Sequence, residues 1–175
     1  IVMLAPAAVR RDRRRLPGRL IYHFPIGQAL DDGIYRPIEF VPVELSQIGS
    51  VDRSIAEKTS ELFQHERQTN NDVSLLIRTD RIHKCDNLAK IYKDFGVDTI
   101  TIHSDMPQRK ANEQLRRIRN GDVNAVITVG MMAGGIDIPG LKIASLHAPP
   151  QSLPYTLQLV GRISRTPKFQ SGPAY

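Results

Sequence analysis

The sequence predicts an α/β domain in which helices cover a mostly parallel β-sheet. After residue 70, short apolar runs alternate with amphipathic stretches of helical length. The apolar runs have the length and composition of strands that are buried on both faces of a sheet. With 175 residues, of which 41% are apolar, the chain is also long enough to bury one core.

The first predicted strand is VSLLI, residues 73–77, and a helix is expected over residues 81–94. Apolar residues recur every three or four positions along that helix, at Ile82, Cys85, Leu88 and Tyr92. Gly96 follows as a C-terminal stop. DTITIH, residues 98–103, is the second predicted strand.

A second helix is expected to begin at Pro107, with Ser104 or Asp105 as its cap, and to end at Asn120-Gly121. NAVITV and LKIASLH, residues 124–129 and 141–147, are the third and fourth predicted strands. The last helix begins near Ser152 and Pro154 and ends before Pro167. Its expected inward residues are Leu153, Leu157 and Val160.

Before residue 70 the pattern favours two strands, LIYHF at 20–24 and IEFVPVEL at 38–45, with a short helix at 28–30 between them. Pro42 restricts the second strand to an edge. A longer helix is expected over residues 51–68, with Ile55 and Leu62 on one face.

Most of the net charge of +6 lies in one run, because residues 10–19 hold six arginines and one aspartate, a charge of +5. Such a run is usually a solvated arm. The sequence has no apolar run of the roughly 18 residues that a transmembrane helix needs, so no membrane partner is expected. The single cysteine, Cys85, excludes an internal disulfide and a cysteine zinc site, which fits a cytoplasmic location. Because the chain begins with Ile1, we expect a fragment of a longer protein.

The sequence lacks the motifs of several common catalytic and metal sites. The sequence contains no GxxxxGK[ST] phosphate loop and no GxSxG nucleophile elbow. The five histidines have no metal-ligand spacing, and a lone histidine at a strand end is usually structural. No metal site is predicted.

The octapeptide QLVGRISR, residues 158–165, places polar groups together. On a continuous helix with Gln158 at the origin, Arg162 falls at about 40° and Arg165 at about −20°, so the three share a face. Two guanidinium forks suit a phosphate chain, and Gly161 lets another surface approach closely. The alternative is a salt-bridged surface face.

The stretch GGIDIPG, residues 134–140, follows the third strand directly. Its loop is therefore expected at the carboxyl end of a parallel strand, where ligands bind in open α/β sheets. Asp137 at that crevice can accept hydrogen bonds from ribose hydroxyls. The alternative is a plain turn between two strands.

These stretches, in this order, resemble a known family. VITVGMMAGGIDIPGLKIASLHAPPQSLPYTLQLVGRISR resembles motifs V and VI of superfamily two helicases, and VSLLIRTDRIHKCDNLAKIY resembles motif IV. The stretch around Arg109 resembles the segment that connects them. The similarity covers residues 72–166 and implies a RecA-like, three-layer second motor domain.

The resemblance implies that ATP lies between this domain and a first motor domain that carries the phosphate loop and holds the Mg²⁺ ion. Arg162 and Arg165 are similar to the residues that reach the γ-phosphate, one of them as an arginine finger, and Gln158 to the residue that senses it. Gly135, Gly161 and Asp137 are similar to positions that line the nucleotide. The chain alone is expected to be inactive.

By the same resemblance, the nucleic-acid backbone contacts a second group of positions, which are Thr79, Arg81, Arg109, Thr128 and Gly134. Such phosphate contacts position a strand without reading its sequence. Motif VI opens with glutamine where DEAD-box RNA helicases have histidine, which favours DNA over RNA. Ser164 stands where many members have glycine.

Residues 1–45 are interpreted as the end of the first motor domain and an inter-domain connector, and 46–175 as the helicase C-terminal domain. Residues 16–45 resemble the connecting segment of the branch related to restriction-enzyme and phage helicases. Two alternatives stay open: a non-catalytic RecA-like module that binds nucleic acid or protein, and the translocase part of a restriction enzyme.

Overall fold

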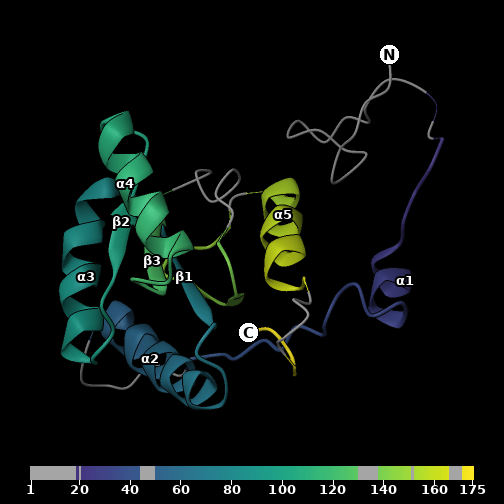
Figure 1. Cartoon of the computed structure of the whole chain (residues 1–175), viewed down its shortest axis with the longest axis horizontal. Coiled ribbons are helices and arrows are strands. Elements are labelled where there is room, and N and C mark those ends of the chain that lie inside the picture. The colour runs from purple at the N-terminus through teal and green to yellow at the C-terminus, as the bar shows by residue number, and fades with distance from the viewer. Residues whose placement is uncertain (1–18, 20, 44–49, 130–137, 151, 166–170) are drawn as a thin grey trace.

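The structure is a computed structural model, and it describes residues 19, 21–43, 50–129, 138–150, 152–165 and 171–175. Helices and strands alternate along the chain (Figure 1). Their bounds are α1 Ile26–Asp31, α2 Val51–Thr69, β1 Ser74–Thr79, η1 Ile82–Lys84, α3 Cys85–Asp94, β2 Ile100–Ile102, α4 Gln108–Arg119, β3 Ala125–Val129, β4 Leu141–Leu146 and α5 Leu153–Ile163.

The described strands form one four-stranded sheet in the order β2-β3-β1-β4. All three pairings are parallel. One apolar cluster joins α2 and α3 to one face of the sheet, and a second joins α4 and α5 to the other. The predicted α/β fold with a parallel sheet between two helical layers is therefore confirmed.

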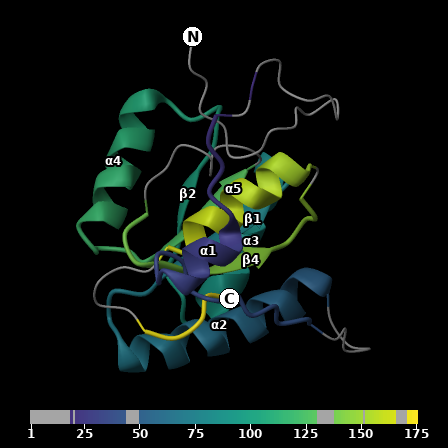
Figure 2. The same ribbon diagram turned by 90° about the vertical axis from the view of Figure 1, so that its right-hand side faces the viewer.

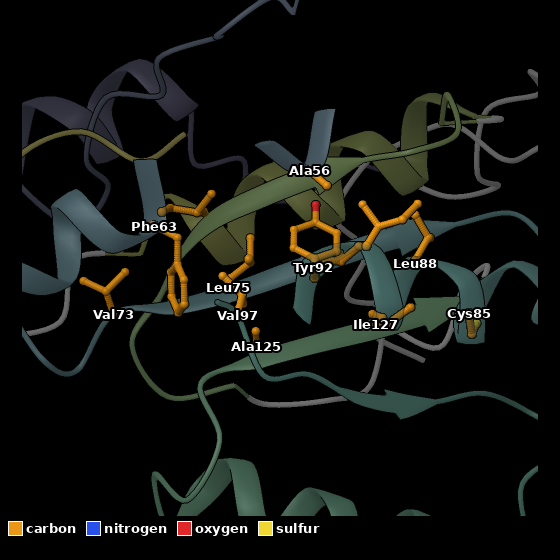
Figure 3. Packing of buried hydrophobic residues seen from close by; sticks show 13 residues of the cluster. Ala56, Phe63, Val73, Leu75, Cys85, Leu88, Tyr92, Val97, Ala125 and Ile127 are labelled. Carbon is orange, nitrogen blue, oxygen red and sulfur yellow. The ribbon is translucent and has the colours of Figure 1, made fainter. Parts of the chain in front are cut away.

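Side-chain alternation along β1 explains the two layers. Leu75 and Ile77 belong to the cluster under α2 and α3, whereas Leu76 belongs to the cluster under α4 and α5. Figure 3 shows the first cluster, in which the Tyr92 ring from α3 packs close to Ala56 from α2.

The elements predicted after residue 50 are confirmed to within a few residues. The cap expected for α4 is wrong, because the helix begins after Pro107 without a side-chain cap and the Ser104 hydroxyl donates to Asp105 instead, at 2.9 Å. The inward face expected for α5 is also shifted. Tyr155, Leu159 and Ile163 are buried, while Leu157 and Val160 are only half-buried.

The two strands predicted before α2 are wrong in their described parts. Residues 21–25 and 39–43 have no regular structure, and Ile21 and Phe40 are 74% and 83% exposed. Apolar runs predict strands only where a neighbouring strand accepts their hydrogen bonds, and Pro42 removes a donor from the second run. Instead, residues 32–43, below called the α1–α2 segment, pair through two isolated bridges, Tyr35 with Arg165 and Ile38 with Ala174.

Candidate functional site

Helix α5 carries part of the predicted phosphate-binding face. Gln158 is exposed and Arg162 is half-buried, and their spacing of four places them on one side of the helix. The helix ends at Ile163, with the Ser164 N–H donating to the Val160 carbonyl at 3.0 Å. Arg165 therefore lies beyond the helix, and its predicted place on the same helical face is wrong.

The main chain of Arg165 is held by another part of the protein. It forms an antiparallel bridge with Tyr35, and the Arg36 N–H donates to the Ser164 carbonyl at 2.7 Å. The Arg165 side chain itself is exposed. The direction of the chain after α5 thus depends on residues that lie far upstream in the sequence.

Gly161 faces the α1–α2 segment. A Cβ atom built on this glycine would lie 3.5 Å from the Tyr35 hydroxyl, an ordinary van der Waals distance. In the described part of the chain, the surface that approaches Gly161 is therefore the Tyr35 side chain.

Replacing Gly161 with alanine is expected to raise the free energy of unfolding by about 0.5–1 kcal/mol, because glycine is the poorer helix former and the new methyl group has room. Urea unfolding of the chain measures this. The matched control is Gly121→Ala, whose Cβ atom would meet nothing within 4 Å but whose φ of +76° is expected to make the substitution destabilising. A Gly161→Ala variant that is less stable than the parent would contradict the assigned contact.

Thr79 is the last residue of β1 and Thr128 the last but one of the neighbouring β3, yet the structure does not bring their side chains together. The alternation of the strands places Thr79 on the α2/α3 face and Thr128 on the α4/α5 face. Both side chains are fully buried, and neither hydroxyl has a hydrogen-bond partner among the described residues. Contact of either threonine with the nucleic-acid backbone stays a prediction.

Arg81 and Arg109 are exposed near the carboxyl edge of the sheet, after β1 and β2 respectively. Arg81 lies beside Asp80, with 3.7 Å between Nε and Oδ2, and Lys84 pairs with the same carboxylate at 3.0 Å. The hydrogen bond from Lys84 lowers the pKa of Asp80. These cations are accessible to a phosphate chain that follows the carboxyl edge.

Gly134, Gly135 and Asp137 lie outside the described residues. The description resumes at Ile138, which is buried in the same apolar cluster as Ile163 at the end of α5. Gly140 then has φ +66°, a left-handed conformation that favours glycine, and its carbonyl accepts the Ser74 N–H at 2.9 Å. Gly140, the last glycine of GGIDIPG, thus forms the turn that leads into β4.

Arg78 is a buried cation that the sequence analysis missed. It is 3% exposed, and its Nη1 donates to the Pro149 carbonyl at 3.0 Å and also to the Ala148 carbonyl. Its guanidinium carbon lies 5.0 Å from the centroid of the Tyr155 ring, so it also makes a cation–π contact with α5. Arg78 therefore holds the loop between β4 and α5. Extending the predicted strand VSLLI by one residue would have placed the Arg78 side chain on the same buried face of the sheet as Leu76.

A buried polar network lies at the end of β4. The His147 ring contacts the Asp52 carboxylate through Nδ1 at 2.8 Å and the Tyr92 hydroxyl through Nε2 at 2.9 Å. The Tyr92 hydroxyl donates to Ser145 at 2.8 Å, and Thr59 shares that serine hydroxyl at 2.9 Å. Burial raises the pKa of the Tyr92 hydroxyl. The expectation that His147 is a structural histidine is confirmed, since the network joins α2, α3 and β4.

Lowering the pH is expected to destabilise the chain through His147. Burial lowers the pKa of His147 below 6.5, although the Asp52 carboxylate opposes this. The unfolded chain therefore takes up a proton near pH 6.5 that the folded chain excludes, and stability falls as the pH falls below that value, by up to about 1.4 kcal/mol per pH unit.

Urea unfolding at a series of pH values from 7.5 to about 5 tests this. A His147→Asn variant is expected to lose stability less steeply over the same range, because it lacks the titrating ring. Equal slopes for the parent and the variant would show that His147 does not titrate differently in the folded chain.

Among the residues that the structure describes, no cluster of three or more histidine, cysteine, aspartate or glutamate side chains is arranged to hold a metal ion. None of the described helices combines the length and hydropathy needed to span a bilayer.

Comparison with known proteins shows which family the sequence matches. A model of the helicase conserved C-terminal domain matches residues 55–167. The putative ATP-dependent helicase IRC3 of Saccharomyces cerevisiae is 25% identical over 175 residues, which cover 87% of this chain and 25% of the relative. The ATP-dependent RNA helicase p62 of Drosophila melanogaster is 24% identical over 172 residues, which cover 90% of this chain and 24% of the relative.

Among solved structures, a DEAD box protein from Methanococcus jannaschii superposes with a TM-score of 0.57 at 20% identity, over 78% of this chain and 34% of the other. At that identity the likeness shows the fold, which is RecA-like. The chain spans about a quarter of the length of the two relatives named above. Several other relatives are also named as ATP-dependent RNA helicases.

Proposed function

The chain belongs to the family of helicase conserved C-terminal domains, the second motor domains of superfamily two ATP-dependent helicases, and we propose that it supplies arginines to ATP held by a first motor domain. The observation that carries the proposal is the arrangement at the end of α5. Gln158 is exposed, Arg162 is half-buried on the same side, and Arg165 is exposed just beyond the helix.

The chemistry of this arrangement suits phosphoryl transfer. Each guanidinium presents a rigid fork of donors that matches phosphate oxygens. Arg165 and Arg162 neutralise the charge that develops on the transferred phosphoryl group, and Gln158 orients the attacking water. Asp137, Gly135 and Gly161 would line the nucleotide. The Mg²⁺ ion that accompanies ATP is held by the first domain and not by residues of this chain.

We place the nucleic-acid contacts at the carboxyl edge of the sheet, on the opposite side of the domain from the end of α5. Helix α5 begins after the loop at the carboxyl ends of the strands, whereas Arg36 links its last residue to Leu141, the first residue of β4. The exposed Arg81 and Arg109 therefore lie at the carboxyl edge, away from the end of α5. With this separation, one domain can contact nucleic acid at the carboxyl edge of the sheet and ATP at the end of α5.

RNA and DNA are both candidates for the bound nucleic acid. The names of most relatives cited above specify RNA, whereas the glutamine that opens QLVGRISR favours DNA. We propose further that residues 1–45 join the two motor domains and that the protein is either a helicase or a translocase, including the translocase of a restriction enzyme.

Steady-state ATP hydrolysis by the full-length protein tests the proposal. Single-stranded RNA and single-stranded DNA of the same sequence are added separately, and the polymer that raises turnover is the substrate. Raising the salt concentration is expected to weaken this stimulation, because the contacts are to phosphates. A folded protein that hydrolyses no ATP with either polymer would instead support the non-catalytic binding module.

A further inference from the structure

A buried arginine joins the α1–α2 segment to the end of α5. Arg36 is 4% exposed, and its Nε donates to the Ile163 carbonyl at 3.1 Å while its Nη2 donates to the Leu141 carbonyl at 3.0 Å. These two carbonyls belong to the last residue of α5 and the first residue of β4. One guanidinium thus ties the end of the helix to the sheet.

The main chain around Arg36 makes the same connection. Its N–H donates to the Ser164 carbonyl at 2.7 Å, and the residue before it, Tyr35, bridges Arg165. On the other side, the Pro37 carbonyl accepts the Ala174 N–H at 2.8 Å. The α1–α2 segment therefore lies between the end of α5 and the C-terminal residues. Figure 2 views the molecule from the side on which α1 lies in front of α5.

The C-terminal residues anchor this arrangement to β4. The Tyr175 N–H donates to the Lys142 carbonyl at 3.0 Å, and the Ala144 N–H donates to the Tyr175 carbonyl at 2.8 Å. The nearly buried Lys142 ammonium pairs with Glu66 from α2 at 2.5 Å and donates to the Ser171 carbonyl at 2.9 Å. The position of Arg36 is thus fixed by the edge of the sheet.

Burial also defines the electrostatics of Arg36. It lowers the pKa of the guanidinium, although the Glu66 carboxylate opposes this. Arginine side chains stay protonated in proteins, and Arg36 therefore carries a positive charge. A charged, desolvated guanidinium is favourable here because its donors meet the carbonyl of Ile163, at the negative end of the α5 dipole.

We infer that Arg36 is a positioning residue for Arg165, because it fixes the turn by which the chain leaves α5. The inference rests on the proposed function, in which Arg165 contacts the γ-phosphate of ATP. Arg36 does not touch the nucleotide. It sets the direction of the two residues that follow Ile163, and misplacement of a catalytic group by about 1 Å can lower a rate roughly 100-fold.

The test is ATP hydrolysis by the full-length protein carrying Arg36→Met, which keeps most of the aliphatic length and removes the donors. The expected result is a fall in kcat of roughly 10- to 100-fold, with KM for ATP unchanged. Arg36→Lys keeps the charge and one donor direction, so it is expected to recover part of kcat. The matched control is Arg53→Met, because Arg53 is an exposed arginine whose guanidinium contacts Asp94 and the Phe95 ring instead of α5, and its kcat is expected to match the parent.

Combination with Arg165→Lys separates positioning from a general structural role. If Arg36 acts through Arg165, the double variant Arg36→Met/Arg165→Lys is no slower than Arg165→Lys alone. Rate losses that multiply, a change confined to KM, or a normal kcat in Arg36→Met would each overturn the inference. If Arg36→Met fails to fold, Arg36→Lys carries the same comparison.

The controls also separate this inference from the proposed function. A slow Arg165→Lys variant beside a normal Arg36→Met variant refutes only the positioning role. Normal turnover in Arg165→Lys and in Arg165→Ala refutes the proposed function, and the role of Arg36 is refuted with it.

Discussion

Replacing Arg165 with alanine in the full-length protein is expected to lower nucleic-acid-stimulated ATP turnover by about 10³- to 10⁵-fold. The reason is electrostatic: the guanidinium neutralises charge that is larger in the transition state than in the bound substrate. Its loss should therefore lower kcat more than it raises KM. Steady-state ATP hydrolysis with saturating nucleic acid measures both constants.

The fold should survive this substitution. The Arg165 side chain is exposed, and the contacts of this residue with Tyr35 are made by the main chain, which alanine retains. The thermal midpoint of unfolding is therefore expected to stay within about 2 °C of the parent. The exposed arginine control Arg53→Ala should retain both stability and turnover. Turnover at the parent rate in Arg165→Ala would refute its role as an arginine finger.

Replacing Tyr92 with alanine is expected to lower the free energy of unfolding by about 3–5 kcal/mol. The ring is fully buried between α2, α3 and the sheet, in the cluster of Figure 3. Its hydroxyl also joins Ser145 and His147 in the buried network. The variant loses the packed ring and leaves two buried polar partners without their tyrosine contact.

Tyr92→Phe divides this loss into two parts. It keeps the ring and removes only the hydroxyl, so a smaller loss of about 1–3 kcal/mol is expected. Tyr22→Ala is the matched control, because Tyr22 is 74% exposed and its removal should change stability by less than about 0.5 kcal/mol. Urea unfolding measures all three. Equal stability of Tyr92→Ala and Tyr22→Ala would contradict the assigned core.

The sheet and its helices were predictable because their signals are local. The apolar run of residues 73–77 has the length of a buried strand, and the repeat of Cys85, Leu88 and Tyr92 has the period of a helix. The strands expected before α2 failed for the opposite reason. Whether residues 38–43 form a strand depends on a partner strand, and the described chain offers them the single residue Ala174, which bridges Ile38 and accepts the Glu39 N–H.

The candidate site divides in the same way. The spacing of Gln158 and Arg162 along α5 followed from helical geometry alone. The position of Arg165 did not, because the helix ends at Ile163 and its carbonyl is bound by Arg36, which is 127 residues away in the sequence. No local pattern contains that contact.

The helical signal therefore predicted that Gln158 and Arg162 share one side of α5 but not the turn that directs Arg165. Arg78 shows a related limit: its guanidinium contacts the carbonyls of Ala148 and Pro149, some 70 residues later in the chain. The predicted strand stopped at Ile77, whereas Arg78 lies within β1 and its partners depend on the packing of α5 on the sheet.

The central claim is that this domain presents Arg165 to ATP bound by another domain. The most direct test is a structure of the full-length protein with a single strand, ADP and a mimic of the γ-phosphate. The account predicts a guanidinium nitrogen of Arg165 at about 2.7–2.9 Å from the mimic. An Arg165 side chain that points into solvent or pairs with a carboxylate in that complex would contradict it.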